Sequence, residues 1–332
     1  MVNKVSNSRR IAILILLILA GELIFFLPFV FARVFRPTLL EVFQISNLEL
    51  GTYFSIYGLV AMVSYILGGP LADKFSSRNL ISLALVATSL GGIALALEPS
   101  KALLTWVYAW WGFTTIFLFW AALIKSTRLW GGDAYQGKAF GFLEGGRGGT
   151  AALVASLALI AFADLSSEIS LELNSELRIA SYRKVMLISS ALIIVCAILI
   201  RFVMPADKNT GLRNAEKISL SKLFQLAKMP ELWLLSGIII CAYAGYKITD
   251  IFSLYAKEIM GFNEFEAARF GTIILWMRPL FAILAGIAAD RFSPSKTLIL
   301  LFIILLAGSI FMLFEPSSGS LIIPIISLII SV

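Results

Sequence analysis

Long apolar runs separated by short charged segments make up most of the chain. Each run reaches the roughly 20 residues that an α-helix needs to cross a hydrocarbon core about 30 Å thick. A transmembrane β-barrel would show short segments of alternating hydrophobicity, and the sequence lacks them. The pattern predicts an all-α polytopic membrane protein. A tenth span begins near Leu321, after nine complete spans near residues 11–33, 50–72, 79–98, 102–124, 138–163, 185–204, 231–256, 266–289 and 297–315.

Composition agrees with a chain that lies in a bilayer. Hydrophobic residues occupy 59% of the 332 positions, charged residues occupy 14%, and the mean hydropathy is +0.92. Such a chain has too little polar surface for a soluble globule. The first span follows the basic residues Lys4, Arg9 and Arg10, but it is too long for a signal peptide and lacks a small-residue cleavage site. We therefore expect it to remain a membrane span.

Basic residues concentrate in alternate loops, and this sets the expected orientation. Cytoplasmic loops carry an excess of Lys and Arg, so we expect a cytoplasmic N-terminus. The expected cytoplasmic cations are Lys74, Arg78, Lys125, Arg128, Lys138, Lys208, Arg213, Lys217, Lys222, Lys228, Arg291 and Lys296. The opposite side holds Asp164, Glu168, Glu172 and Glu176, partly offset by Arg178, Arg183 and Lys184. The net charge of +7 is then a topology signal, and we expect no nucleic-acid partner.

Several kinds of chemistry are not expected from this sequence. It has no histidine, which excludes a histidine proton relay and a histidine metal site. Cys196 and Cys241 lie inside separate predicted spans, where we expect no disulfide framework. We find no catalytic triad and no cluster of metal ligands. The sequence therefore predicts neither an enzyme nor a bound cofactor or metal.

A polar stretch at residues 205–230 divides the chain. We predict an N-terminal six-helix bundle at residues 1–204, a cytoplasmic linker at 205–230 and an incomplete second bundle at 231–332. Within the linker, "ISLSKLFQLAK" alternates apolar and basic residues at helical spacing. That spacing suggests a short helix on the cytoplasmic membrane face, and a solvated linker fits equally well.

A sequence phrase occurs twice and indicates an internal duplication. "GGPLADKFSSR" at 68–78 returns as "GIAADRFSPSK" at 286–296, at a constant offset of 217 residues. At the same offset Glu49 matches Glu266, and each stands before an apolar span, where a carboxylate favours a helix N-terminus. Repeated halves are common in secondary transporters, whose solute site lies between the halves near the membrane midplane. The matched motif positions are Gly69 with Gly286, Asp73 with Asp290, and Lys74 with Arg291.

The motif in the loop after the second span resembles that of the major facilitator superfamily, G-x-L-a-D-r-x-G-r-r. Ser76 and Ser77 replace the usual glycine and basic residue, and the second copy is looser. The resemblance implies two helical bundles that alternate access to a midplane site in a bacterial cytoplasmic membrane. It also implies that the Asp73 and Asp290 loops latch the cytoplasmic side in the outward-open state. The matching residues are Gly69, Leu71, Asp73, Lys74 and Arg78.

A weaker resemblance is to the organophosphate transporter branch. It rests on "FARVFRPTLLEVF", "FWAALIKSTRLWGGDAYQGKAFGFLEGGRGG" and "YKITDIFSLYAKEIMGF". That branch implies a basic residue in the first and seventh spans that holds a phosphoryl group. Arg33 and Lys247 lie close to those places without matching them residue for residue, which leaves the substrate class open.

Charged residues inside predicted spans are the main candidates for a solute site. Each costs about 2.5 to 3.5 kcal/mol at the helix centre, and such a cost usually accompanies a function. Arg278 lies deep in the eighth span, and Lys247 lies in the seventh, three residues before Asp250, with which it could pair instead. Arg33 ends the first span, where its side chain could reach lipid headgroups. We predict that Arg33, Lys247 and Arg278 bind an anionic solute such as an organophosphate or a sugar acid.

Two further features concern coupling and gating. Glu22 lies mid-span, where burial penalises its charged form, so it is a candidate proton carrier, as is Asp250. A neutral glutamic acid hydrogen-bonded to a neighbouring helix is the alternative for Glu22. Glu144 and Arg147 stand three residues apart in a glycine-rich part of the fifth span and are candidate gate residues. The glycines there allow close helix packing: Gly141, Gly145, Gly146, Gly148 and Gly149.

The sequence as a whole predicts a secondary active transporter of a small anionic organic solute. It would be a symporter or antiporter, with protons or phosphate as the coupling ion and membrane lipid around it. A proton-coupled transporter of a neutral solute stays open, as does a receptor or assembly factor on the same fold. Trp110 and Trp111 are expected in an interfacial belt or against lipid. The last residues lie inside the tenth span, so we expect a fragment of a twelve-span protein; a truncated product is the alternative. The sequence indicates no oligomeric state.

Overall fold

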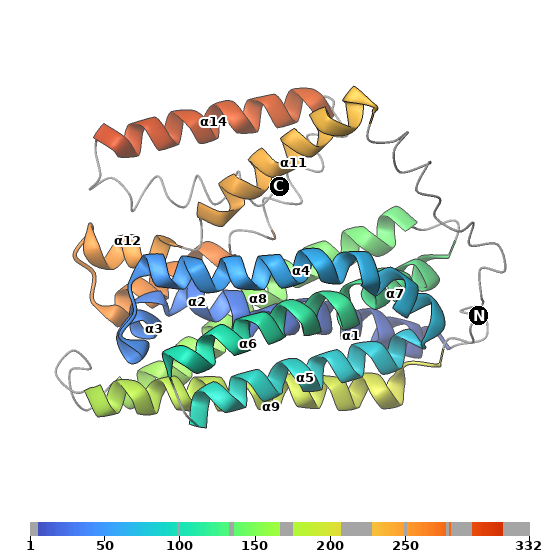
Figure 1. The fold of residues 1–332 in the computed structure, drawn as a ribbon, viewed down its shortest axis with the longest axis horizontal. Helices are drawn as coiled ribbons and strands as arrows, with labels where there is room; N and C mark the ends of the chain where they lie inside the picture. The colour runs from blue at the N-terminus through green and yellow to red at the C-terminus, as the bar shows by residue number, and fades with distance from the viewer. Residues whose placement is uncertain are drawn as a thin grey trace.

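Every element in the part of the chain that the computed structural model describes is a helix. The described residues are 6–97, 100–132, 136–166, 175–206, 228–248, 251–276, 279 and 294–314. Long helices run side by side through most of the molecule (Figure 1). This architecture confirms the predicted all-α fold.

The first half of the chain supplies the long helices of one bundle. They are α1 (Asn7–Phe25), α2 (Phe31–Val34), α3 (Arg36–Phe43), α4 (Asn47–Lys74), α5 (Ser77–Leu97), α6 (Lys101–Phe113), α7 (Ala121–Gly131), α8 (Gln136–Ser166) and α9 (Ser175–Val203). Two π-helical segments, η2 (Phe26–Val30) and η3 (Thr114–Trp120), join α1 to α2 and α6 to α7.

The second half contributes fewer described helices. They are α11 (Pro230–Ile248), α12 (Phe252–Glu258), a helix at residues 264–276, and α14 (Pro294–Phe314). In Figure 1, α11 and α14 lie on one side of the molecule, whereas α5 and α9 lie on the opposite side. The surface helix that we predicted in the linker falls on residues 218–228, all of which except Lys228 lie outside the described residues.

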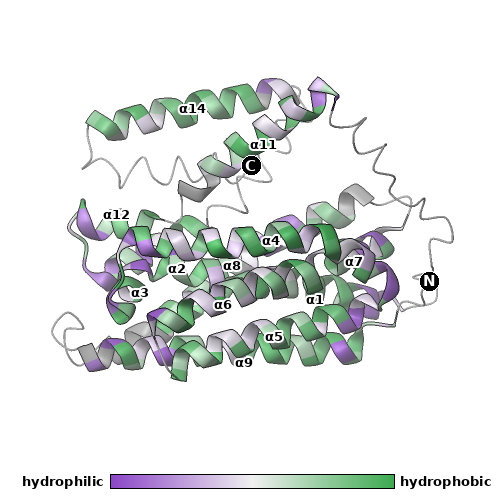
Figure 2. Cartoon of the chain, viewed as in Figure 1, coloured by the Kyte–Doolittle hydropathy of each residue, from purple (hydrophilic) through white to green (hydrophobic). Residues whose placement is uncertain are grey.

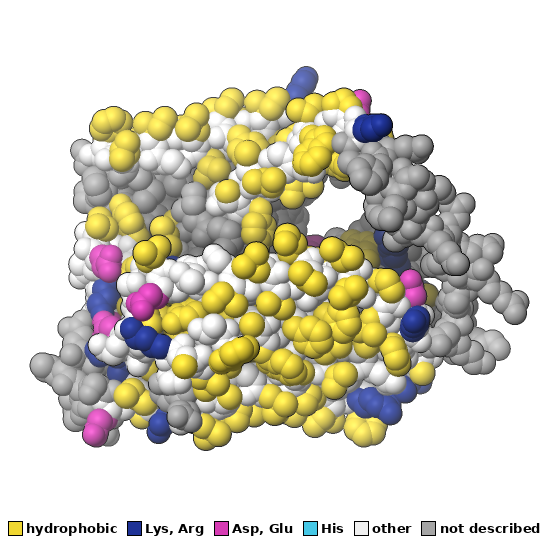
Figure 3. All heavy atoms as spheres, in the orientation of Figure 1, with side chains coloured by type: hydrophobic (Ala, Val, Ile, Leu, Met, Phe, Trp, Pro, Cys, Tyr) yellow, Lys and Arg dark blue, Asp and Glu magenta, His cyan; other side chains and the backbone are white. Residues whose placement is uncertain are grey.

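Among the described residues, five helical stretches are long and apolar enough to cross a membrane. Three of them, Asn7–Val34, Asn47–Lys74 and Ser77–Leu97, agree with predicted spans to within four residues at each end. Lys101–Gly131 extends seven residues beyond the predicted span 102–124, and Arg178–Val203 begins seven residues before the predicted span 185–204. Figure 2 shows apolar residues along the lengths of these helices and hydrophilic residues towards their ends. Figure 3 shows the same distribution on one face, where hydrophobic side chains cover the middle and charged side chains gather at both ends. This is the surface that a membrane-embedded bundle presents to lipid.

The first span changes its helical geometry near its far end. Pro28 lies within η2 and has no backbone N–H, so the α-helical hydrogen-bond ladder is interrupted there. The π-helical turn keeps the chain helical across that gap. Phe29, also in η2, packs edge-on against Tyr57 of α4 with ring centroids 4.7 Å apart. Tyr57 in turn shares a 2.6 Å hydrogen bond with Thr115 of η3, so both π-helical segments lie against α4.

The duplication is visible in how two helices begin. Ser46 and Glu49 form a capping box: the Ser46 N–H donates to Glu49 Oε2 at 2.6 Å, and the Glu49 N–H donates to Ser46 Oγ at 3.1 Å. Asn263 and Glu266 repeat it at 3.0 and 2.8 Å. Such boxes satisfy backbone donors that a helix N-terminus leaves without partners. The expectation that Glu49 and Glu266 stand at equivalent helix starts is confirmed.

The two halves meet near one end of the bundle, which we call the distal end because it lies opposite the start of α1. There α12 lies beside α2 and α3 (Figure 1). Ser253 of α12, which is fully buried, donates a 2.6 Å hydrogen bond to the Arg33 carbonyl. Gly271 lies near Val34, because a Cβ built on Gly271 would stand 3.6 Å from the Val34 Cα. Backbone and small side chains thus make close contacts between the halves at this end.

One aromatic prediction was wrong. Trp111 was expected against lipid or at the membrane interface, but its residue exposure is 1% and its indole N–H donates to the Thr88 carbonyl at 3.0 Å. Trp110, the neighbouring residue, is 41% exposed and donates to the Ala87 carbonyl at 2.7 Å. The two indoles therefore tie α6 to α5.

Candidate functional site

A buried ion pair occupies the middle of the first span. Glu22 lies halfway along the stretch from Asn7 to Val34, with roughly 20 Å of helix on either side at 1.5 Å per residue. Arg147 Nε of α8 lies 3.4 Å from Glu22 Oε2, and the side chains are 14% and 7% exposed respectively. Arg147 Nη1 also donates to both oxygens of Glu144, at 2.9 and 3.0 Å. We call Glu22, Glu144 and Arg147 the central charge cluster.

Glycines bring the two helices of this cluster together. A Cβ built on Gly146 would stand 2.6 Å from Ile18 Cγ2, closer than side chains approach one another. A Cβ on Gly21 would stand 3.1 Å from Arg147 Cδ. The missing side chains therefore allow α1 and α8 to approach closely and leave room for the arginine stem. Of the glycines expected to allow such packing, Gly146 does so here.

Aromatic rings flank the arginine of the central charge cluster. The Arg147 guanidinium lies 5.7 Å from the ring centroid of Phe25 and 5.6 Å from that of Trp120. The two rings meet edge-to-face with centroids 6.0 Å apart. Ring faces stabilise a desolvated cation. Phe25 is the last residue of α1, next to η2, and Trp120 is the last residue of η3. The rings beside Arg147 therefore come from the first span and from the α6–α7 span.

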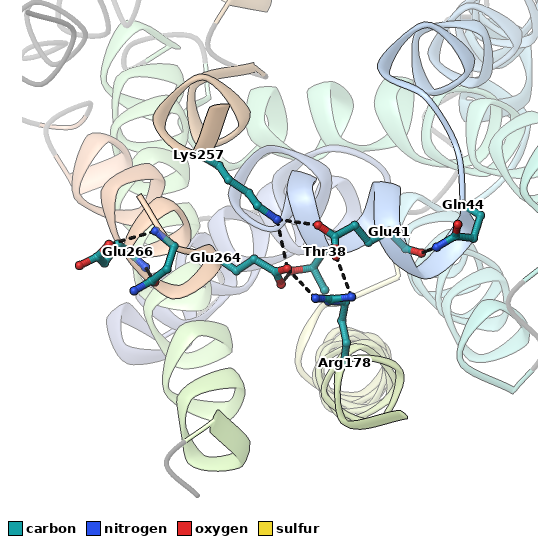
Figure 4. Close-up of polar contacts among 8 residues, drawn as sticks. Thr38, Glu41, Gln44, Arg178, Lys257, Glu264 and Glu266 are labelled. Atoms are coloured by element: carbon teal, nitrogen blue, oxygen red, sulfur yellow. Dashed lines mark hydrogen bonds and ion pairs between the residues drawn. The ribbon is translucent and has the colours of Figure 1, made fainter. Parts of the chain in front are cut away.

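A second charged group joins the halves at the distal end (Figure 4). Arg178 of α9 contacts Glu41 at 2.7 Å and Glu264 at 3.1 Å. Lys257 of α12 contacts the same two carboxylates at 2.5 and 3.2 Å. Thr38 Oγ1 donates to Glu264 Oε2 at 3.2 Å. We call Glu41, Arg178, Lys257 and Glu264 the distal ion-pair network.

Within the distal ion-pair network, Glu41 and Lys257 are held in their charged forms. Burial alone would raise the pKa of the Glu41 carboxyl. The hydrogen bond from Lys257 and the charges of Lys257 and Arg178 together hold that pKa below its ordinary value. Burial alone would lower the pKa of Lys257, but the hydrogen bond to Glu41 and the charge of Glu264 hold it above its ordinary value. Ion pairing thus outweighs desolvation for both groups.

The basic residues near the end of the first span are buried. Arg33 is 5% exposed, so its side chain does not extend to lipid headgroups, which was one of the two expectations for it. Arg36 is 3% exposed; its Nε donates to Asn47 Oδ1 at 2.8 Å, and its guanidinium lies 5.9 Å from the Phe54 ring centroid. Arg36 was not among the predicted site residues.

The first copy of the loop motif lies at the end of α4. Asp73 and Lys74 are exposed there, and Gly69 is partly exposed. Arg78 Nη1 donates to the Met204 carbonyl, just beyond α9, at 3.4 Å. Lys125 Nζ donates to the Ala72 carbonyl at 2.7 Å, where a cation complements the negative end of a helix. These contacts tie the motif to α7 and to the end of α9.

The remaining predicted site residues fall in parts of the chain of which less can be said. Lys247 belongs to α11, and its side chain is not described. The others lie outside the described residues: Asp250, Arg278, Gly286, Asp290 and Arg291. Pro279, which follows Arg278, lies close to α8, because a Cβ on Gly148 would stand 3.3 Å from the Pro279 Cγ. Pro279 thus lies opposite Gly148, one helical turn along α8 from Glu144.

Three residues of the distal ion-pair network, Glu41, Lys257 and Glu264, were not among the predicted site residues. Arg178 was expected only as an outer-loop cation. Their one sequence signal is that each lies within a few residues of the end of an apolar run. Among the described residues, no three His, Cys, Asp or Glu side chains come together to hold a metal ion.

Comparison with known proteins identifies relatives of the whole chain. The family model described as Major Facilitator Superfamily matches residues 11–332. The inner membrane protein YqcE of Escherichia coli is 26% identical over 272 residues, which cover 81% of this chain and 62% of YqcE. The inner membrane protein YihN of the same organism is 27% identical over 317 residues, which cover 93% of this chain and 73% of YihN. The chain thus spans less than two thirds of the length of YqcE.

Solved structures share the fold at low sequence identity. A bacterial homologue of the human lysosomal transporter Spinster, in an inward-facing conformation, superposes with a TM-score of 0.73 at 20% identity, covering 98% of this chain and 73% of that one. The nucleoside transporter NupG gives 0.70 at 14% identity, covering 96% and 79%. A D-xylose–proton symporter gives 0.68 at 15% identity, covering 97% and 79%.

Proposed function

Because the chain belongs to the major facilitator superfamily, we propose that it acts in secondary transport of a small organic anion by alternating access. The N-terminus lies in the cytoplasm in this proposal, and the distal end faces outwards. Two of the structural relatives are a nucleoside transporter and a D-xylose–proton symporter, which supports membrane transport. They do not specify the solute of this chain.

The central charge cluster is the observation that carries this proposal. A buried arginine in the middle of a membrane bundle is expensive unless it has partners, and such residues face the bundle interior or a pathway. Arg147 stands where α8 meets both α1 and the second half, near Pro279. A guanidinium binds a carboxylate or phosphoryl group through directed, charge-assisted hydrogen bonds. Arg147 is therefore suited to hold the charged end of an anion.

Further cations complete the proposed anion site. The proposed additional ligands are Arg33, Lys247 and Arg278, because each is a basic residue within or at the end of a predicted span. The burial of Arg33 at the contact between the halves agrees with a role there. Glu22 is the proposed proton carrier because it shares Arg147 with Glu144. A proton on Glu22 would release part of the arginine's charge for the solute, and Asp250 is the second candidate carrier.

Two gates accompany this site. The distal ion-pair network closes the outer side, because it joins α3 and α9 to α12 and the helix of residues 264–276. The Asp73 and Asp290 loops close the cytoplasmic side in the alternate state. A solute shifts the balance between the two states only as far as it binds them with different affinity.

A second function remains a candidate because of one observation. Glu22 and Glu144 together offset the charge of Arg147, and a compensated arginine can hydrogen-bond a neutral hydroxyl-rich solute. In that case the protein would carry a neutral solute with protons.

Flux through liposomes tests these proposals. The purified protein would be reconstituted in liposomes, and uptake of radiolabelled inorganic phosphate, glucuronate and D-xylose would be followed with and without a pH gradient. We expect uptake of an anion and a loss of about tenfold or more in Arg147→Gln, since a hydrogen bond to a charged group contributes about 1.5–3 kcal/mol. Xylose uptake that survives the substitution would favour the neutral solute. No uptake of any probe would contradict transport.

A further inference from the structure

The way in which Glu144 binds Arg147 points to the binding position of the solute. One guanidinium nitrogen, Nη1, donates to both carboxylate oxygens, at 2.9 and 3.0 Å. A charge-assisted contact of this kind is also what an incoming carboxylate would need from Arg147. The Glu144 carboxylate is therefore itself an occupant of an anion site.

The two carboxylates of the central charge cluster differ in how firmly they are held. The Glu22 side chain is 7% exposed and is enclosed between α1 and α8, whereas the Glu144 side chain is 55% exposed. Moving Glu144 away from Arg147 returns its carboxylate to open surroundings at little desolvation cost. Moving Glu22 away would leave a charge buried without its partner. Of the two, Glu144 is the one that an incoming anion can displace.

The position of Glu144 on α8 directs it towards the second half of the molecule. Glu144 and Gly148 are one turn apart and so lie on one face of the helix. A Cβ on Gly148 would stand 3.3 Å from Pro279 of the second half. Glu144 thus faces the contact between the halves, where transporters with repeated halves bind their solutes.

The surroundings of Arg147 also indicate what lies next to the bound anion. Phe25 and Trp120 flank the guanidinium at 5.7 and 5.6 Å and are both partly exposed. A solute whose carboxylate takes the place of Glu144 brings its next atoms close to these rings. Rings and flat apolar groups pack favourably against aromatic faces and edges. The site therefore favours a carboxylate attached to a ring over a small aliphatic one.

We propose that Glu144 is a built-in competitor that occupies the solute site of Arg147 and is displaced by a ring-bearing monocarboxylate. The proposal rests on the anion transport proposed above and names the solute class and the residue that limits its affinity. Glu144 is then not part of a gate. Its role is to keep Arg147 neutralised while the site is empty.

Binding to the purified full-length protein tests this proposal. Equilibrium dialysis in detergent would measure [14C]benzoate binding, with acetate, cyclohexanecarboxylate, glucuronate and the neutral benzamide as competitors. We expect Glu144→Gln to bind benzoate about tenfold more tightly, because the competing charge-assisted contact is removed. Glu258→Gln, which removes an exposed carboxylate from α12, is the matched control and should leave affinity unchanged.

Two further variants separate the parts of the site. Arg147→Gln should abolish benzoate binding. Trp120→Leu should weaken benzoate binding roughly two- to tenfold and leave acetate binding unchanged, since an aromatic pair contributes about 0.5–1.5 kcal/mol beyond the area it buries. Cyclohexanecarboxylate and glucuronate would distinguish an apolar ring from a sugar ring as the favoured body, and benzamide should not compete.

The results have distinct meanings. Unchanged or weaker benzoate binding in Glu144→Gln would overturn the competitor role, provided that the variant unfolds thermally at the same temperature as the wild type. Equal competition by acetate and cyclohexanecarboxylate would overturn the ring-bearing class. Absence of benzoate binding in both wild type and Glu144→Gln would overturn the inference while liposome uptake of phosphate still supported anion transport. Benzoate binding without flux of any probe would support the role of Glu144 and contradict the proposed transport.

Discussion

The Arg178 guanidinium lies 3.1 Å from the Glu264 carboxylate and joins α9 to the helix of residues 264–276. Arg178 also contacts Glu41, and Lys257 contacts both carboxylates. Each half of the molecule thus supplies one acid and one base, and each charge is paired within its own half and across to the other. Separating the halves therefore breaks two ion pairs between the halves. Arg178 still pairs with Glu41 and Lys257 with Glu264, so the network can open without leaving a charge unpaired.

Removal of Lys257 should loosen the distal end. We expect Lys257→Gln to raise the rate at which a cysteine at Ser253 reacts with a membrane-impermeant maleimide by roughly five- to tenfold, after Cys196 and Cys241 are replaced by alanine. Ser253 is fully buried between the halves, so the reaction requires them to separate. The expected rise in labelling rate corresponds to the loss of one charge-assisted contact. The energy of that contact is reduced by solvent screening because the Lys257 side chain is a quarter exposed.

Lys101→Gln is the matched control for that experiment. Lys101 also pairs with a glutamate, Glu49, at 3.3 Å, but this pair joins α4 and α6 within one half. Its loss should leave Ser253 labelling unchanged. Equal labelling rates in Lys257→Gln and Lys101→Gln would show that the distal ion-pair network does not hold the halves together.

The distal end should respond to pH only outside the neutral range. The pKa of Glu41 is depressed in the closed state, so its contribution to closure is complete above its ordinary value of 4.5 and is lost as pH falls through the lowered pKa. The pKa of Lys257 is raised, so its contribution is complete below 10.5 and is lost as pH rises further. Closure should therefore be constant from about pH 5 to pH 10.

Electron–electron double resonance between spin labels at Gln44 and Glu258 would check this pH range. Both residues are exposed and lie on the two halves, beside Glu41 and Lys257 respectively. We expect one short distance from pH 5.5 to pH 9 and a longer population below about pH 4.5. A gradual lengthening between pH 6 and pH 8 would contradict the assigned carboxylate and ammonium.

Local sequence signals were sufficient to predict much of the fold. The hydrophobic runs placed the long helices, and the repeated Glu49 and Glu266 placed two equivalent helix starts, since a capping box depends only on residues three apart. Helix α3 was not predicted, because it lies in a short connection of mixed polarity. Trp111 was placed at the surface because an indole carries both apolar and polar character, and only packing against α5 decides between surface and core.

The pairing within the site could not be predicted from local signals. Glu22 was singled out as a buried mid-span carboxylate and Arg147 as a candidate gate residue, but nothing in the sequence indicates that α1 packs on α8. The contact depends on Gly21 and Gly146 meeting the opposite helix, which is a property of the tertiary fold. For the same reason Lys257 and Glu264 were not identified from the sequence, since their pairing depends on how their helices meet Glu41 and Arg178.

Glu22 should govern coupling more than binding. We expect Glu22→Gln to abolish uphill accumulation of a labelled anion driven by a pH gradient while exchange of internal for external anion remains measurable. The neutral amide keeps a polar group beside Arg147 but cannot carry a proton. Accumulation and counterflow in liposomes separate the two activities, with Glu231→Gln, an exposed carboxylate in the first turn of α11, as the control. Unchanged accumulation would exclude Glu22 as the proton carrier.

The approach of α1 to α8 should depend on one of two adjacent glycines. A Cβ at Gly146 would stand within 3.0 Å of three atoms of the Ile18 side chain, whereas a Cβ at Gly145 would meet nothing within 4 Å. We expect Gly146→Ala to destabilise the protein by about 1–3 kcal/mol, because a branched side chain in a packed interface cannot move aside. Gly145→Ala should stabilise α8 by roughly 0.5–1 kcal/mol through helix propensity. Thermal unfolding of both variants in the same detergent measures the difference, and equal midpoints would mean that α1 and α8 are farther apart than these contacts require.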